Sequence, residues 1–341
     1  MAARQITLAE VAQHAGVSLA TASRVLNGSN RQVSEELRDR VMVSAESLGY
    51  LPNASAQALA RNSSSLVGLV VHDISDPYFS SIAAGVTRVA EDAGLVVVLG
   101  TTARHTERER ELLCVLRAHR AKAVVIIGSR TTDKAATARL AEEIGTFIAQ
   151  GGRVACVSQA RLPADTVVPA NKAGARALAR ELVRLGHRRF AVLGGPEELL
   201  TSRDRIAGFR AGLAESGVDL PESSVRHGEF GRDGGYRSAA ELVADGSTAT
   251  CVFAVNDVMA LGAMAALRAA GRRVPEDVSV AGFGDIPTLR DVTPTLTTVR
   301  LPLEEMGVRA AHMALGEYTG PQPRTVKMAA EVVLRESTLG V

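Results

Sequence analysis

Tryptophan is absent from this chain of 341 residues, and aromatic residues make up only 3% of it. Alanine, valine and leucine must therefore supply most of the packing of any hydrophobic core. The three cysteines, Cys114, Cys156 and Cys251, are far apart, which suggests neither a disulfide framework nor a metal cluster. The histidines are also scattered, without the spacing of metal ligands. We expect no metal site and no cofactor.

The chain also lacks a long apolar run and a signal peptide, so we expect a soluble, cytoplasmic protein without membrane contacts. Neither sign of charge is in excess: the formal net charge is +2, and residues 1–61 carry six arginines and five acidic residues. Because no overall basicity indicates a nucleic-acid partner, such a function has to be argued from a motif. The length suits a small module followed by a two-lobed core.

A motif of that kind occupies Thr7–Gly28, whose spacing predicts a helix, a tight turn and a second helix. Thr7 and Glu10 stand at the spacing of a capping box, in which each side chain bonds the other residue's backbone amide. Gly16 comes where a left-handed residue would end the first helix, and glycine adopts that conformation at little cost. Ser18 can then cap the second helix.

The second helix is predicted to bury Ala22, Val25 and Leu26 and to leave short polar groups and one arginine outside. Such a face suits the major groove of DNA, where hydroxyls bind phosphates and arginine can donate to both acceptors of guanine. The alternative is a helical hairpin without a ligand, which the two caps and the turn glycine disfavour. The candidate DNA contacts of this module are Thr7, Ser18, Leu19, Ala20, Thr21, Ser23, Arg24 and Asn27.

The pattern V-S-x-x-T-x-S-R-V-L-N in this stretch resembles the DNA-binding headpiece of the LacI/GalR family of bacterial repressors. The match continues through Gly49–Asn53. We therefore expect a helix-turn-helix headpiece in residues 1–52, completed by a third helix that Ser34 caps and Gly49 ends.

Residues 53–65 are expected to form a hinge helix and a polar linker. Asn53 can cap this helix, but so short a helix is not stable alone in water. Its only large apolar side chain is Leu59, which could dock on its own chain or, as the resemblance implies, insert into the minor groove beside the hinge helix of a second copy. Ala56 and Ala60 would let two such helices approach closely.

From residue 66 onward, apolar runs alternate with helical stretches, which predicts an α/β core with buried parallel strands. The expected strands are Leu66–Val71, Leu95–Leu99, Ala123–Ile127, Val154–Val157, Phe190–Leu193, Cys251–Val255, Val278–Phe283, a crossing strand in Thr293–Arg300 and a final strand Thr325–Leu334. The core resembles the two-lobed periplasmic-binding-protein fold of the same family. We expect lobe one in about 66–158 and 301–320, and lobe two in about 163–292 and 325–341, joined near Ser158–Pro169.

Ligands of open parallel sheets bind at the carboxyl ends of the strands, so the residues that follow each strand are candidates for an effector pocket. Tyr78 and Phe79 could stack on a ring, and the polar surroundings suit a small hydroxylated ligand. The family match is strong here, in DISDPYFSSIAAGV, RDRIAGFRAGL and the long run that begins NDVMALG. It implies that Arg205 and Asn256 hydrogen-bond the effector. The full candidate set is Tyr78, Phe79, Ser129, Ser158, Arg205, Asn256 and Asp285.

Three positions depart from the family pattern: Gly284 and Ser158 stand where relatives often carry aspartate, and Leu301 where they usually carry glutamine. With these acceptors replaced, donors outnumber acceptors, which favours a ligand rich in acceptors such as an oligosaccharide or a sugar acid. An alternative is that Arg205 pairs with Asp204 or Asp285 and only braces the loops.

The sequence therefore predicts a homodimeric transcriptional repressor that binds a pseudo-palindromic operator in double-stranded DNA and responds to a small carbohydrate-type effector. The family resemblance implies that the effector releases the repressor from the operator. It carries no catalytic motif, so we predict no enzymatic activity. A solute-binding protein or a sugar-handling enzyme with a similar core is the alternative, but neither accounts for the headpiece. The tail Arg335–Val341 has one leucine and cannot form a coiled-coil seam, so we expect a dimer as the final assembly.

Overall fold

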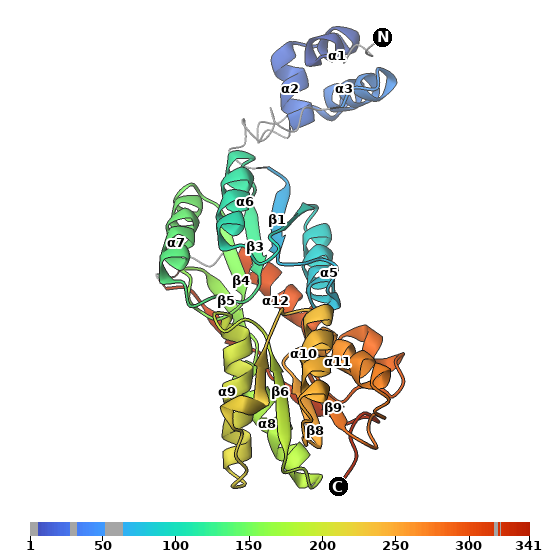
Figure 1. Ribbon diagram of the computed structural model, residues 1–341. Helices are drawn as coiled ribbons and strands as arrows, with labels where there is room; N and C mark the ends of the chain where they lie inside the picture. Colours follow the sequence, from blue (N-terminus) through green and yellow to red (C-terminus); the bar gives the residue numbers. More distant parts are fainter. Residues whose placement is uncertain (1–5, 28–32, 52–63, 317–319, 321) are drawn as a thin grey trace. The chain divides into compact units, whose positions relative to one another are not determined.

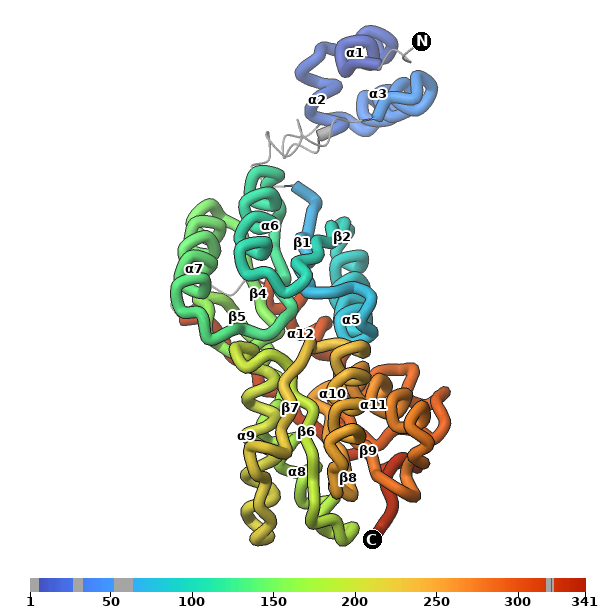
Figure 2. The backbone as a smooth tube through the Cα atoms, viewed as in Figure 1, coloured from blue at the N-terminus to red at the C-terminus, as the bar shows by residue number. Residues whose placement is uncertain are grey.

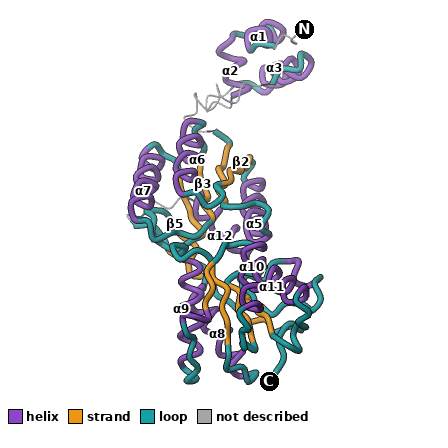
Figure 3. Tube along the Cα trace, viewed as in Figure 1, coloured by secondary structure: helices purple, strands orange, loops and turns teal. Residues whose placement is uncertain are grey.

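The computed structural model describes residues 6–27, 33–51, 64–316, 320 and 322–341. The chain divides into two compact units, Met1–Ser65 and Leu66–Val341. Each unit has hydrophobic clusters of its own. Figures 1 and 2 show the course of the chain, and Figure 3 shows its helices and strands.

The first unit contains the helices α1 (Leu8–Ala15), α2 (Leu19–Asn27) and α3 (Glu35–Ser47). The capping box predicted at the start of α1 is present: Thr7 Oγ1 accepts from the Glu10 amide, and Glu10 Oε2 accepts from the Thr7 amide at 2.8 Å. Gly16 ends α1 in the left-handed conformation with φ 63°, as its position predicted. The small core of the unit comprises Val11, Ala12, Ala15, Ala22, Val41 and Ala45.

The start of α3 differs from the prediction in one detail. Ser34 holds the N-cap position, but its side chain makes no capping hydrogen bond. The first turn instead carries Glu35 and Glu36, whose charges favour the positive end of the helix. At the other end, Gly49 adopts φ 64°, and the Tyr50 amide donates to the Ala45 carbonyl at 2.8 Å. This arrangement closes the helix as predicted.

The first lobe of the core is built on a parallel sheet with strand order β11-β5-β4-β3-β1-β2. Helices α5 and α12 pack against one face of this sheet, and α6 and α7 against the other. With helices on both faces, β1 and β3 are buried along almost their whole length. The bounds are β1 Leu66–Val71, β2 Val96–Thr101, β3 Ala123–Ile127, β4 Arg153–Val157, β5 Asp165–Val168, β11 Thr325–Lys327, α5 Pro77–Asp92, α6 Thr106–Ala118, α7 Lys134–Ala149 and α12 Leu303–Leu315.

The second lobe has a parallel sheet with strand order β7-β6-β8-β9, also covered by helices. A separate antiparallel pair, β10 with β12, lies beside α8. The bounds are β6 Phe190–Gly194, β7 Val225–His227, β8 Cys251–Ala254, β9 Ser279–Ala281, β10 Thr298–Arg300, β12 Glu331–Val333, α8 Asn171–Arg184, α9 Leu200–Ala214, α10 Arg232–Ala244 and α11 Asp257–Ala269, with short 3-10 turns at Glu222–Ser224 and Pro287–Arg290.

Two expected bounds are wrong: the first lobe extends beyond residue 158, and the final strand is divided between two sheets. The stretch expected to join them contains β5, which pairs with β4 in the first-lobe sheet. The expected final strand is two strands: β11 pairs with β5 in the first lobe, and β12 pairs with β10. The ion pair between Arg324 and Asp165, with Nε 2.9 Å from Oδ2, fixes β11 beside β5. The first-lobe sheet therefore includes residues 165–168 and 325–327, because pairing partners far apart in sequence decide where short strands lie.

Candidate functional site

In the headpiece, α2 presents the face that the sequence predicted. Ala22 is fully buried, whereas Leu19 is 53% exposed and Ala20 and Arg24 are exposed as well. Ser18 Oγ accepts from the Thr21 amide at 3.1 Å and lies 2.9 Å from Thr21 Oγ1. This cap orders the first turn of α2. Ala20 and Arg24, four residues apart, lie on the same exposed side of the helix.

The remaining headpiece candidates are placed as follows. Thr7 is exposed and belongs to the capping box of α1, Ser23 is half-buried, and Asn27 is the last residue of α2. The expected hinge helix, with Asn53, Ala56 and Leu59, lies outside the described residues.

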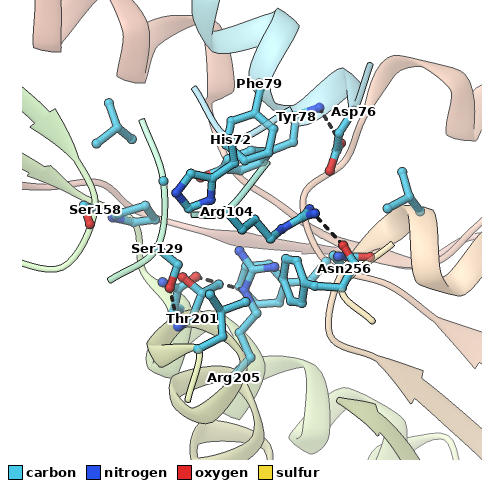
Figure 4. A pocket seen from close by; sticks show the side chains of 18 of the residues that line it. His72, Asp76, Tyr78, Phe79, Arg104, Ser129, Ser158, Thr201, Arg205 and Asn256 are labelled. Carbon is cyan, nitrogen blue, oxygen red and sulfur yellow. Dashed lines mark hydrogen bonds between the residues drawn. The ribbon is translucent and has the colours of Figure 1, made fainter. Parts of the chain in front are cut away.

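In the core, a narrow cavity lies between the two lobes (Figure 4). The residues that follow β1, β3 and β4 in the first lobe line it, as do those near the ends of β6, β8 and β9 in the second. This is the strand-end position expected for a ligand of such sheets. Six of the seven predicted effector residues line the cavity: Tyr78, Phe79, Ser129, Ser158, Arg205 and Asn256.

The buried Arg205 enters this cavity from α9. Its Nε donates to Asn171 Oδ1 at 2.9 Å and its Nη1 to the Val255 carbonyl at 2.6 Å. The guanidinium lies over the Phe283 ring, 3.9 Å from the centroid. Burial lowers the pKa of Arg205 to about 10, which still leaves it charged at neutral pH. The predicted alternative, in which it pairs with Asp204 or Asp285, is not what the structure shows.

Asn256 has one buried polar atom that no protein group engages among the described residues. Its Oδ1 caps α11 by accepting from the Met259 amide at 2.7 Å. Its Nδ2 is buried and has no hydrogen-bond partner in the part of the chain that the structure describes. A buried donor without an acceptor costs free energy, and such exceptions concentrate at functional sites.

Arg104 and Phe230, which the sequence did not single out, close the cavity from opposite lobes. Arg104 follows β2 and donates from Nη2 to the Phe230 carbonyl at 2.9 Å, with its guanidinium 5.6 Å from the centroid of the Phe230 ring. Ala103 and Arg104 both have positive φ values, 47° and 65°, which are unfavourable for residues other than glycine. The rule that ligands bind at strand ends includes the residues that follow β2. It does not predict that Arg104 contacts the other lobe.

The volume left inside the cavity is about 40 Å³. Since a single water needs about 10–15 Å³ on this measure, the space holds a few waters and no sugar. Admission of a ligand therefore requires the lobes to separate or the Arg104 side chain to move.

Beneath the cavity, a buried ion-pair network anchors the first lobe. Arg130 donates to both carboxylate oxygens of Glu109, at 2.7 and 2.6 Å, and its Nε donates to Ser158 Oγ at 3.2 Å. His72 Nε2 lies 3.3 Å from Glu109 Oε1. Burial opposes the charge of Glu109, but Arg130 and the hydrogen bond with His72 hold its pKa at about 2. Burial lowers the pKa of His72 below 6.5 despite Glu109, so this ring is neutral at neutral pH.

The same network supports a contact between the lobes, here called the cross-lobe strip and formed by residues 129–132 and 198–201. The Leu200 amide donates to the Arg130 carbonyl and the Thr132 amide to the Glu198 carbonyl, both at 2.9 Å. The Thr201 amide donates to Ser129 Oγ at 2.9 Å. Thus Ser129, a predicted ligand contact, also fastens the lobes together.

Asp285 is the predicted effector residue that the structure does not place in the cavity. Its carboxylate accepts from Arg300 Nε at 2.7 Å and from Arg335 Nη2 at 2.6 Å, and its side chain is only 3% exposed. Asp285 is therefore a brace for the loops, because two cations from distant parts of the chain engage its oxygens.

Two carboxylates line the cavity, Asp76 and Asp257, and Asp257 is the more deeply buried. Thr298 Oγ1 donates to its Oδ1 at 2.6 Å, and the Ile286 amide donates to its Oδ2 at 3.0 Å. Burial raises the pKa of Asp257 to about 6. A Cβ atom added at Gly284 would lie 2.9 Å from Asp257 Oδ2. Because Gly284 has no Cβ atom, it leaves room for this buried carboxylate.

Among the described residues, no helix is long and apolar enough to cross a membrane. The same residues contain no cluster of three or more histidine, cysteine, aspartate or glutamate side chains placed to hold a metal ion.

A helix-turn-helix unit joined to a two-lobed core with an interlobe cavity defines the class of ligand-responsive DNA-binding regulators. The chain belongs to the LacI family of transcriptional regulators. Residues 7–53 match the family model for "bacterial regulatory proteins, lacI family", and residues 179–338 match that for a "periplasmic binding protein-like domain".

Individual relatives cover the whole chain. The HTH-type transcriptional regulator CelR of Thermobifida fusca is 33% identical over 98% of both chains. The solved CelR–cellobiose complex has a TM-score of 0.70 at 30% identity and covers 98% of this chain and 100% of that one. The lac repressor dimer bound to operator and the anti-inducer ONPF has a TM-score of 0.81 at 26% identity, with the same coverage. The protein is therefore a DNA-binding transcriptional regulator, and the alternatives of a solute-binding protein or a sugar-handling enzyme are not favoured.

Proposed function

We propose that this regulator is a homodimeric repressor that binds a pseudo-palindromic operator and is released from it by a carbohydrate-type effector. Two identical headpieces related by a two-fold axis require matched half-sites. The exposed α2 face with Arg24 supports base reading, and the solved lac repressor dimer on its operator supports the assembly. Because its proposed target is an operator in bacterial DNA, we expect the protein to act in the cytoplasm.

The main support for an effector site in the cavity is the buried Asn256 Nδ2, which has no hydrogen-bond partner among the described residues. Together with Arg205 it offers donors to the hydroxyl or carboxylate oxygens of a ligand. Tyr78, Phe79 and Phe230 supply aromatic surface for the apolar face of a sugar ring. The other proposed contacts, Ser129 and Ser158, already hold protein partners, so they contribute as acceptors with a spare lone pair.

An effector of this kind must compete with Arg104 for the space in front of Phe230. A ligand that binds the separated lobes better than the closed ones shifts the population toward the separated form. Such a shift would alter how two hinge segments meet on DNA. The donors of Arg104, Arg205 and Asn256 favour an acceptor-rich ligand, an oligosaccharide or a sugar acid, over a free monosaccharide.

The test measures binding of the full chain to DNA fragments from its own promoter, with and without a panel of sugars that begins with cellobiose. We expect specific binding that one sugar class weakens. The discriminating variant is Asn256→Ser, which retains a side chain able to cap α11 but removes the Nδ2 donor. Normal operator binding with a lost sugar response supports the site. A normal sugar response, or no specific DNA binding by the parent protein, refutes the corresponding half of the proposal.

A further inference from the structure

A groove separate from the effector cavity crosses the junction of the lobes, on the side of the core where α7 and α9 lie (Figure 1). Its volume is about 820 Å³, within the range of small-molecule sites. Four cationic side chains from the two lobes line it: Lys134, Arg161, Lys172 and Arg203. The hydroxyl-bearing residues Thr131, Thr132 and Thr137 lie between them.

The cations of this groove are poorly neutralised by the protein. The only carboxylate in its lining is Asp204, whose Oδ1 lies 3.6 Å from Lys172 Nζ. Lys134, Arg161 and Arg203 form no ion pair within the residues that the structure describes. Their neighbours on the same helices behave differently: Arg176 and Arg180 share Glu215, and Arg139 pairs with Glu107. Like charges collected without counterions repel one another, and an anion bound among them would remove that repulsion.

The groove and the effector cavity lie on opposite sides of the cross-lobe strip. Leu199 and Thr201 of the strip line the cavity, whereas Thr131 and Leu200 line the groove. The backbone bridge between Thr131 and Leu199 separates the two spaces. The groove is therefore a distinct site, and none of its cations contacts the cavity.

We propose that this groove binds a small phosphate-bearing metabolite. Arginine guanidinium groups match phosphate oxygens in a two-point geometry, and lysine supplies a compact charge. Lys134 and Arg161, which lies in the loop between β4 and β5, belong to the first lobe, and Lys172 and Arg203 belong to the second. A bound phosphate thus holds the lobes in the arrangement described and stabilises the core against unfolding.

The experiment uses the full chain without DNA and inorganic pyrophosphate as the probe. Calorimetric titration gives the affinity, and thermal unfolding is measured against sodium chloride of equal ionic strength. We expect saturable binding and a rise in melting temperature beyond that in the salt control. Arg161→Ala and Arg203→Ala should each weaken pyrophosphate binding about tenfold, because each removes a charge-assisted donor.

Lys122→Ala is the matched control, since it removes an exposed positive charge outside the groove. Its pyrophosphate affinity should equal that of the parent protein. Equal weakening in this control, or no melting shift beyond salt, overturns the proposal. So does an affinity that falls in Asn256→Ser but not in the groove variants, because the anion then sits in the effector cavity. Operator binding plays no part in these measurements, so their failure is separate from failure of the proposed repressor function.

Discussion

At the scale of single residues, Arg24 is the long donor on the exposed face of α2. If it reads a base, Arg24→Ala should cost about 1–3 kcal/mol of specific binding and relax the preference at one position in each half-site. Selection of operator variants from a randomised library measures this. Uniform weakening across all sequences would identify Arg24 as a phosphate contact instead.

Arg130 neutralises the buried carboxylate of Glu109. Arg130→Met would strand the buried Glu109 carboxylate, so we expect a loss of about 3–5 kcal/mol in the free energy of unfolding of the core. The control is Arg117→Met, whose ion pair with Glu143 lies nearer the surface and should contribute about 0–1 kcal/mol. Urea unfolding compares the two, and equal losses would contradict the assigned role of the buried pair.

His72 gives the core a pH dependence with a defined sign. Its folded pKa lies below 6.5 because of burial, so the unfolded chain binds the proton more readily. The stability that this difference contributes is fully present above pH 6.5 and is lost as pH falls through 6.5 toward the folded pKa. His72→Gln, which does not titrate and can still donate to Glu109, should lose less stability than the parent protein between about pH 7 and pH 5.5. Parallel pH profiles for the two proteins would refute this assignment.

At the scale of elements, the hinge segment links the headpiece to the core. We predict that Leu59→Ala leaves both units folded but removes most of the operator bending, because no side chain then separates the central base pairs. A gel-phasing assay measures the bend, with Ser64→Ala in the linker as a control. Bending that survives in Leu59→Ala would favour the alternative in which Leu59 docks on its own chain.

The cross-lobe strip is the element that joins ligand contacts to lobe closure. Ser129 and Thr201 line the cavity and bond each other across the lobes. Gln159, which accepts from the Arg130 amide, donates to Thr201 Oγ1 at 3.0 Å. A ligand that engages these groups acts directly on the contacts that hold the lobes together, so no remote pathway is needed.

At the scale of the whole molecule, the assembly is predicted to stop at the dimer. The tail Arg335–Val341 packs on its own second lobe: Ser337 Oγ donates to the Val280 carbonyl at 2.6 Å, and the Val341 amide donates to the Leu185 carbonyl at 2.9 Å. It is therefore not available as a coiled-coil segment. Sedimentation at micromolar concentration should give the mass of two subunits, and a mass of four would contradict the prediction.

Local chemistry determined what the sequence could predict by itself. The capping box of Thr7 and Glu10 and the left-handed Gly16 depend on neighbours within a few residues, and the apolar runs that predicted the strands Leu66–Val71 and Ala123–Ile127 are also local features of the sequence. Such interactions are specified before the chain folds. The candidate pocket residues were found because the carboxyl ends of parallel strands meet at one edge of a sheet.

Only the tertiary structure decided which polar groups the protein itself engages. The sequence predicted Asp285 as a ligand acceptor, but in the folded protein Arg300 of β10 and Arg335 of the tail donate to its carboxylate. Arg104 became part of the cavity because the second lobe brings the Phe230 carbonyl within 2.9 Å of its Nη2. Strands β5 and β11 likewise formed where Asp165 and Arg324, far apart in sequence, could pair. Long-range contacts of this kind leave no periodic signal in the sequence, because the partner's position is set by the packing of everything between them.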